Sequence, residues 1–177
     1  NLFIDSFPKM FIRGLTVTIP LTAIAFSLAM VIAVIVALVQ FANIKVLKQI
    51  CRFYIWIFRG TPLLVQLFIV FFGLMNVGLV LEPFLAAVIV FALNEGAYGA
   101  ETVRASLESV PSGQLEAGQC AGLSYLQTIF RIVLPQAMRT AFPSLFNALI
   151  SMLKDTSLAA TITVTEMFKV SQQIVAR

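Results

Sequence analysis

The sequence predicts an all-α membrane protein, a bundle of transmembrane helices. Composition is the first reason: 60% of the residues are hydrophobic and only 11% are charged, whereas a soluble domain carries about 25% charged residues. Distribution is the second, because the charged residues flank uncharged stretches that are long enough to cross a bilayer. Basic residues beside such stretches are typical of topology signals in a multi-pass membrane protein, and not of nucleic-acid binding.

The residue types present exclude several kinds of chemistry. The chain has no His, and its two Cys, Cys51 and Cys120, lack the spacing of metal ligands. We therefore expect free thiols and no metal site. The sequence contains no phosphate-binding loop of the G-x-x-x-x-G-K-[ST] type, so this chain is not expected to hold ATP itself. No catalytic residue is assigned, and the protein is not expected to be an enzyme.

The first span is expected over residues 15–41. No charged residue occurs from Gly14 to Ile44, and about 20 apolar residues are enough to cross the hydrocarbon core. Small residues recur at every fourth position of this span: Ala25, Ala29, Ala33 and Ala37. Such a row lets a second helix approach closely in lipid. The alternative is an alanine-rich helix with no special face.

Basic and aromatic residues are interleaved in the next segment, residues 45–59, which predicts an amphipathic helix lying on the membrane surface. A break follows at Gly60. Thr61 is expected to cap a new helix and Pro62 to occupy its first position. This new helix is the second span, expected over residues 61–81.

The third span is expected over residues 83–107, after a turn at Glu82, and its helix ends before Pro111. The fourth is expected over residues 138–165. Its apolar part stops at Leu153 and is too short to cross a bilayer alone. A charged pair comes next in the chain, so we expect this span to be broken or distorted there.

Lys and Arg residues orient these spans. The loop after the first span is basic and contains no acidic residue, whereas the next loop carries only Glu82. Under the positive-inside rule the first loop is cytoplasmic and the second external, which puts residues 101–139 in the cytoplasm. Lys9 and Arg13, on the N-terminal flank, favour the opposite orientation more weakly.

The polar segment 112–135 is expected to form two short helices. Gly122 stands where a helix C-terminal glycine belongs. Ser124 and Gln127 predict a capping box for the second helix, which Pro135 is expected to limit. Apolar residues recur in it with helical spacing: Leu126, Ile129, Phe130 and Val133. This apolar stripe can be buried against the chain's own spans or in a groove on another protein.

This segment resembles the EAA loop of ABC importer permeases. The residues that match the loop, with Gly in place of Ala at its third position, are Glu116, Ala117, Gly118, Gly122, Ile132, Leu134 and Pro135. Further strings are similar to the polar amino acid branch of these permeases: residues 59–66, 97–101, 109–111, 122–124 and 154–158. The resemblance covers nearly the whole chain and implies the fold of a type I ABC importer permease.

The resemblance implies an ATP-driven importer of the bacterial cell membrane. Two permease subunits, identical or different, would surround a central path, and each EAA loop would dock as a coupling helix in a groove of an ATP-binding subunit. ATP and Mg would bind to that partner and not to this chain. An extracytoplasmic binding protein would deliver the substrate, and membrane lipid would surround the spans. The family normally has another membrane helix beyond the last residue of this sequence, so we expect a fragment.

The seven matching residues are the candidate ATPase-coupling residues, with Glu116 and Gly122 foremost. A purely structural cap at Glu116, and packing of Ile132, Leu134 and Pro135 onto the spans, are the alternatives. The candidates for the substrate path are polar residues within the spans: Gln66, Glu95, Lys154, Asp155 and Thr156. An ionised side chain in lipid costs about 2.5–3.5 kcal/mol, so it is expected to face the bundle interior or to lie at the interface. For Gln66, a bond to another helix is the alternative.

Two other functions compete with the importer. A secondary transporter driven by an ion gradient needs inverted repeats and intramembrane acidic sites, and the sequence has no clear internal repeat. A non-transporting scaffold subunit explains the helices and the docking loop, but it does not explain Lys154 and Asp155 within an apolar run. The resemblance favours a polar amino acid as substrate and leaves open which one.

Overall fold

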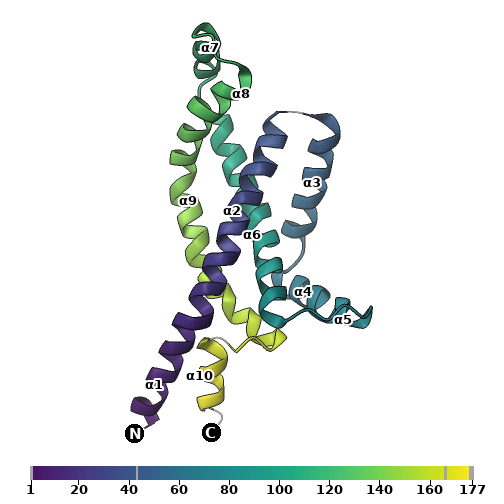
Figure 1. Ribbon diagram of the computed structural model, residues 1–177, viewed down its shortest axis with the longest axis vertical. Coiled ribbons are helices and arrows are strands. Elements are labelled where there is room, and N and C mark those ends of the chain that lie inside the picture. Colours follow the sequence, from purple (N-terminus) through teal and green to yellow (C-terminus); the bar gives the residue numbers. More distant parts are fainter. Residues whose placement is uncertain (1, 43, 166, 176–177) are drawn as a thin grey trace.

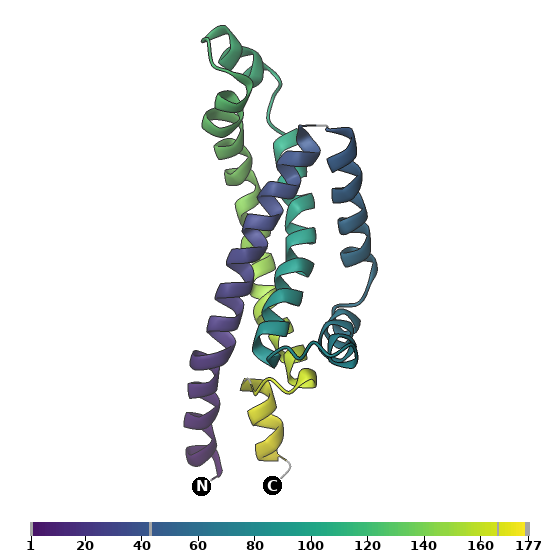
Figure 2. The ribbon, with the colours of Figure 1, turned by 45° about the vertical axis from the view of Figure 1, so that its right-hand side comes forward.

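The structure is a computed structural model, and it describes residues 2–42, 44–165 and 167–175. Every regular element in these residues is a helix, which confirms the predicted all-α fold class. The molecule is elongated, with two short helices, α7 and α8, at one end and both chain termini at the other (Figure 1). The long helices run side by side, as a second view confirms (Figure 2).

The first long helix runs without a break from Leu2 to Phe41. It consists of α1 (Leu2–Arg13), a wider π-helical turn (Gly14–Thr18) and α2 (Ile19–Phe41). Its stretch Met10–Phe41 is long and apolar enough to cross a membrane. The four alanines of the predicted row are all 0% exposed: Ala25, Ala29, Ala33 and Ala37. The row is therefore a packing face.

The helix that packs on this face is α6 (Pro83–Glu108), which is also long and apolar enough to span. Two glycines of α6 allow the close approach. A Cβ on Gly96 would lie 2.9 Å from Ile32 Cγ2, and one on Gly99 would lie 3.0 Å from the Cβ of Ala33. Small residues on both helices thus bring the two backbones together, as is common for helices that associate in lipid.

The amphipathic helix α3 (Lys45–Gly60) runs lengthwise beside α6 (Figures 1 and 2). We expected it to lie flat on the membrane surface, crosswise to the spans, and this orientation is wrong. Two contacts hold it upright: the Tyr54 hydroxyl donates to the Leu93 carbonyl at 2.5 Å, and Ile55 is buried. α6 covers the side of α3 that holds Tyr54 and Ile55, whereas most apolar residues of α3 remain exposed, including Val46, Ile50 and Phe53.

A sharp bend separates α3 from the next helical segment, and the two axes differ by 104°. That segment comprises α4 (Leu63–Phe68), a π-helical turn (Ile69–Gly73) and α5 (Leu74–Asn76). The bent pair is a third candidate crossing. The expected cap at Thr61 is wrong: its hydroxyl donates to the Ile57 carbonyl at 2.8 Å, and α4 starts after an extended Pro62. The hydroxyl therefore completes α3 and does not begin α4.

The chain then forms α7 (Gly113–Cys120) and α8 (Tyr125–Thr128), which continues through a π-helical turn (Ile129–Val133) into α9 (Leu134–Asp155). The prediction that Pro135 limits the second helix is therefore wrong. A proline ring normally clashes with the carbonyl four residues earlier. The wider turn just before Pro135 changes the position of that carbonyl, so the helix continues through it.

The segment expected as the fourth span, residues 138–165, loses its α-helical geometry after the charged pair, as predicted. α9 ends at Asp155 and is followed by a 3₁₀ segment, Thr156–Ile162. Thr163 then adopts a left-handed conformation with φ 69°. The last element, α10 (Met167–Val175), packs against α1 at the end of the molecule far from α7.

Candidate coupling hairpin and polar groove

The hairpin consists of α7, residues 121–124 and α8. At its turn the Leu123 N–H donates to the Gly118 carbonyl at 3.0 Å, and the Gly122 N–H donates to the Gln119 carbonyl at 2.9 Å. This bonding pattern requires a left-handed residue, and Gly122 has φ +77°. No atom lies within 4 Å of the position of a Cβ on Gly122. The backbone conformation, and not lack of space, therefore requires glycine here, and the predicted turn is confirmed.

The second helix of the hairpin begins with the predicted capping box. The Gln127 N–H donates to Ser124 Oγ at 3.3 Å, and the Ser124 N–H donates to Gln127 Oε1 at 2.9 Å. These two bonds satisfy backbone donors that the first turn of a helix otherwise leaves unpaired. Local sequence thus fixes both sides of the turn.

Gly118 lies at the closest approach of α7 to α8. A Cβ on Gly118 would lie 2.6 Å from Thr128 Oγ1, with the Thr128 methyl group nearer still. Thr128 is fully buried, and its hydroxyl donates to the Ser124 carbonyl at 3.0 Å. The Gly in place of Ala at the third motif position therefore makes room for a buried Thr on the opposite helix.

The apolar stripe of the second helix is divided between two environments. Ile129 and Val133 are buried in a core cluster with residues of α6 and α9. Leu126 and Phe130 are 65% and 55% exposed. One alternative left open by the sequence is thus confirmed for half of the stripe, which packs on the chain's own helices, whereas the other half is exposed.

The remaining motif residues also divide in this way. Glu116 and Ala117 are exposed on α7, whereas Ile132 and Leu134 are half-buried. Leu134 packs against the core cluster that holds Val133. Pro135 is exposed. The exposed surface of the hairpin therefore combines a carboxylate with apolar groups.

Among the predicted path residues, Gln66 lies in the bend between α3 and α4. It is 7% exposed, and its Nε2 donates to the Phe58 carbonyl at 2.9 Å and to Thr61 Oγ1 at 2.8 Å. Its Oε1 accepts from Asn94 Nδ2 of α6 at 3.0 Å. Gln66 is thus the residue that ties the bend to α6, which is the second of the two alternatives for its role.

Glu95 lies in a polar groove between α6 and α9, with a volume of about 560 Å³. We call this the α6–α9 groove. Hydroxyl, amide and charged groups line it: Arg59, Glu95, Tyr98, Glu101, Thr102, Ser144, Asn147 and Ser151. All but Glu95 were missed as candidates. The signal is present in the sequence of α9, where polar residues recur with helical spacing within an apolar run.

The three predicted path residues at the end of α9 are Lys154, Asp155 and Thr156, and their surroundings differ. Asp155 follows Ser151 by one helical turn, so it extends the polar face of α9. Lys154 is exposed. Thr156 is 2% exposed, and its hydroxyl donates to the Leu153 carbonyl at 2.7 Å. The structure therefore leaves Lys154 and Asp155 exposed at the end of α9 and puts Thr156 in a structural position.

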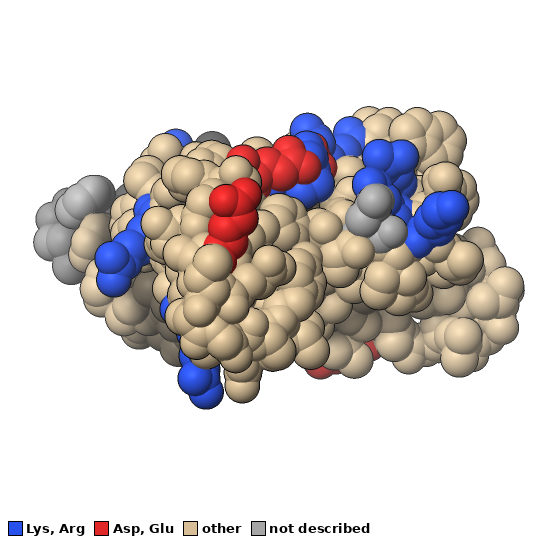
Figure 3. All heavy atoms as spheres, turned by 90° about the horizontal axis from the view of Figure 1, so that it is seen from above, with Lys and Arg blue, Asp and Glu red and all other residues tan. Residues whose placement is uncertain are grey.

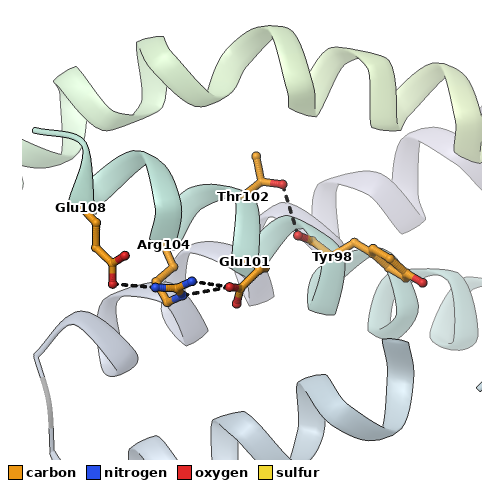
Figure 4. Close-up of polar contacts among 5 residues, drawn as sticks. All are labelled: Tyr98, Glu101, Thr102, Arg104 and Glu108. Carbon is orange, nitrogen blue, oxygen red and sulfur yellow. Dashed lines mark hydrogen bonds and ion pairs between the residues drawn. The ribbon is translucent and has the colours of Figure 1, made fainter. Parts of the chain in front are cut away.

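A charged network occupies α6 next to the groove (Figure 4). Arg104 pairs with Glu101 on one side and donates to Glu108 at 2.6 Å on the other. Thr102 points the opposite way, toward α9. The Arg59 guanidinium stacks over the Tyr98 ring, 5.2 Å from its centroid. Within the described residues no three metal-ligating side chains come together.

Comparison with known proteins gives a consistent result. The family model described as "binding-protein-dependent transport system inner membrane component" matches residues 29–176. The L-cystine transport system permease protein TcyB of Bacillus subtilis is 46% identical over 173 residues, covering 98% of this chain and 74% of the relative. The L-cystine transport system permease protein TcyL of the same organism is 44% identical over 168 residues, covering 89% of this chain and 70% of the relative.

A solved structure agrees with these sequence relatives. The crystal structure of an amino acid ABC transporter with histidines contains a chain that superposes with a TM-score of 0.86 at 33% identity. The match covers 99% of this chain and 84% of that one. The similarity therefore includes the hairpin, the bend and the α6–α9 groove.

Proposed function

Because this chain belongs to the family of binding-protein-dependent transport system inner membrane components, we propose that its α7–α8 hairpin couples ATP hydrolysis by partner subunits to movement of the α6–α9 groove. The chain is a permease subunit of an ATP-driven amino acid importer in the cell membrane. It is not an enzyme, since the ATPase activity of such importers lies in other subunits.

One observation carries the coupling proposal. α6 leads into the hairpin and α9 leads out of it, and the same two helices form the walls of the groove. α8 and α9 form one continuous helix, and Ile129 and Val133 fix its first part in the core. A displacement of the hairpin is therefore transmitted along rigid helices to the groove, as alternating access requires.

The exposed side of the hairpin is the part that we assign to the ATPase. Leu126 and Phe130 present apolar surface, and Glu116 and Ala117 lie exposed on the neighbouring helix. A short helix pair with apolar anchors suits a groove on a partner protein. ATP and Mg would bind to that partner, and their effect on this chain would come only through movement of the hairpin.

The α6–α9 groove is the part that we assign to the substrate. It contains Arg59 and Glu95, with Asp155 one turn beyond Ser151, so it offers groups of both signs to the ammonium and carboxylate of an amino acid. Hydroxyl and amide groups between them can bond a polar side chain. The two relatives named for L-cystine transport make cystine the first substrate to test.

A single chain leaves this groove open along one side, so we propose that a second permease subunit, identical or different, closes it. An extracytoplasmic binding protein would deliver the amino acid at the end of the molecule opposite the hairpin. The same end holds α1 and α10.

Transport by the reconstituted complex tests the proposal. The permease would be produced with its ATPase and binding protein, placed in proteoliposomes, and supplied with labelled L-cystine, arginine or glutamine. We expect ATP-dependent uptake of a polar amino acid and none with a non-hydrolysable ATP analogue. Uptake that follows an ion gradient without ATP would overturn the coupling mechanism. Uptake of arginine or glutamine but not cystine would correct only the substrate.

A further inference from the structure

A second cavity lies between α2, α3 and α6, on the side of α6 that carries the charged network. It has a volume of about 360 Å³, and its lining includes Gln40, Lys48, Arg52, Trp56 and Arg104. We call it the basic groove. An adjoining hollow of about 420 Å³ shares Lys48 and Arg52 and adds Lys45. Neither hollow includes Glu95 or the polar face of α9. The basic groove shares one lining residue with the proposed substrate site, Glu101, whose carboxylate is bound to Arg104.

The acidic residues of the basic groove do not neutralise all of its basic residues. Glu101 and Glu108 also line it, but both are bound to Arg104. In the described part of the chain, Arg52 has no ion-pair partner. Viewed from the hairpin end, basic side chains gather on the side of the molecule where α3 lies (Figure 3). The groove therefore has cationic charge that the chain itself does not neutralise.

Gln40 gives an independent indication of a ligand. The residue is 7% exposed, and among the described residues its Nε2 is the buried side-chain nitrogen that has no hydrogen-bond partner. A buried amide group without a hydrogen-bond partner costs about 1–3 kcal/mol. Buried amide groups in folded proteins therefore normally have a partner. Gln40 lines the basic groove, so an acceptor bound there would satisfy this nitrogen.

The surroundings of the groove indicate where that acceptor comes from. Trp56 and Phe53 are 71% and 61% exposed, and their rings stack with centroids 6.0 Å apart. Exposed aromatic residues beside basic ones are typical of the bilayer interface. A groove between membrane helices that has basic groups at its lining and exposed aromatic rings at its edge suits a phospholipid, whose headgroup is charged and whose chains are apolar.

We propose that the basic groove binds the headgroup phosphate of an anionic phospholipid from the cytoplasmic leaflet. Arg52 and Lys48 neutralise the phosphate, the Gln40 amide donates to one of its oxygens, and Trp56 packs beside the glycerol and the first part of the acyl chains. The leaflet rests on the proposed function, because the groove is cytoplasmic only if the hairpin faces the ATPase. The bound lipid would then fasten α3 to α2 and α6.

Lipid retention by the intact complex tests this site. The importer would first be purified with its ATPase, so a failure of the proposed function shows as loss of that subunit before any lipid is measured. Native mass spectrometry would then count phosphatidylglycerol and phosphatidylcholine molecules retained after mild delipidation. We expect selective retention of phosphatidylglycerol by the wild type, and retention at least about tenfold weaker in Lys48→Gln/Arg52→Gln, since each basic residue near the surface contributes about 1 kcal/mol.

The matched control is Arg139→Gln, which removes an exposed positive charge from α9 and should leave retention unchanged. Equal losses in the control and in the double variant would overturn the proposal, because the attraction would then be a general effect of charge. Inorganic phosphate added at millimolar concentration should not displace the lipid from the wild type. Displacement would assign the groove to a soluble anion instead.

Gln40→Leu separates binding from folding. Replacing an unpaired buried amide by an apolar side chain should leave the melting temperature of the lipid-free complex equal or higher. The rise in melting temperature produced by added phosphatidylglycerol should nevertheless become smaller. A variant that responds to phosphatidylglycerol as strongly as the wild type would remove Gln40 from the site, and with it the observation on which the proposal depends.

Discussion

At the scale of single residues, the absence of a side chain is as informative as its presence. Gly96 and Gly99 allow α6 to approach α2, and Gly118 makes room for Thr128 in the hairpin. Gly122 serves a different purpose, since the space around it is open and only its positive φ requires glycine. Glycines that look alike in the sequence therefore respond differently to substitution.

Gly118→Ala tests the fit between the two helices of the hairpin. The added Cβ would overlap Thr128, and such overpacking costs about 1–3 kcal/mol. We expect a lower melting temperature and reduced uptake. Thr128→Ala should restore both in the double variant, because it removes the atoms nearest to the new Cβ.

Gly113→Ala is the matched control, because no atom lies within 4 Å of a Cβ at that position. It should behave like the wild type. A double variant no better than Gly118→Ala alone would show that the overlap with Thr128 is not the cause.

Glu95→Gln tests the charge of the α6–α9 groove. The change keeps the shape of the side chain and removes its charge, so membrane insertion should be unaffected. A charge-assisted hydrogen bond contributes about 1.5–3 kcal/mol, so we expect the apparent affinity for the amino acid to fall by about tenfold or more. Concentration-dependent uptake in proteoliposomes measures it. Glu82→Gln, on the loop before α6, is the control, and equal effects of both changes would contradict the assignment.

At the scale of elements, the second helix of the hairpin has two separate tasks. Ile129 and Val133 anchor it in the core, whereas Leu126 and Phe130 remain exposed. This division cannot be seen in the helical spacing, because all four residues belong to one stripe. The environment on each side of the helix decides which residues stabilise the fold and which meet the partner.

Two alanine substitutions separate these tasks. Phe130→Ala should leave the melting temperature of the isolated permease unchanged and weaken its binding to the ATPase, since an exposed aromatic anchor contributes at least about 1–2 kcal/mol to an interface. Ile129→Ala should lower the melting temperature, because a cavity in the core costs about 2–5 kcal/mol. Co-purification and thermal unfolding in detergent measure the two effects. The opposite pattern would reverse the assignment of the two faces.

The bend after α3 is an element of its own, and Gln66 holds it. Gln66→Met keeps the length of the side chain but leaves the Phe58 carbonyl and Asn94 without their bonds to it. The Phe58 carbonyl and the Asn94 amide keep a hydrogen bond to each other, so the loss is that of the Gln66 bonds themselves. Each such bond contributes about 0.5–1.5 kcal/mol, and we expect lower thermal stability. Gln172→Met, at an exposed position of α10, should have no effect. Equal stability of both variants would show that the bend does not depend on these bonds.

At the scale of the whole molecule, the open side of the α6–α9 groove predicts a second permease subunit. In a background of Cys51→Ser and Cys120→Ser, Asn147→Cys places one thiol on the polar face of α9. We expect a short bis-maleimide to cross-link the two permease subunits through it. Phe142→Cys, among the exposed apolar residues of the same helix, should not cross-link. Cross-linking of Phe142→Cys but not of Asn147→Cys would place the partner on the apolar face instead.

Much of the hairpin could be predicted from the sequence, because its signals are local. The turn at Gly122 and the capping box of Ser124 and Gln127 depend on residues a few positions apart. The course of the helix through Pro135 could not be predicted, since a proline normally interrupts a helix and the wider turn before it is seen only in the structure. The same holds for Thr61, whose hydroxyl donates to the Ile57 carbonyl before the break and accepts from Gln66 Nε2 after it.

A helical membrane subunit with a two-helix hairpin could be predicted from the sequence alone. Composition, uncharged length and capping residues act within one segment, so they can be recognised without knowing what surrounds it. The upright position of α3, the role of Gln66 beside the bend, and the groove that Glu95 shares with the polar face of α9 became visible only in the folded molecule. These depend on contacts between segments far apart in the chain, and the identity of the neighbour is set by packing and not by periodicity.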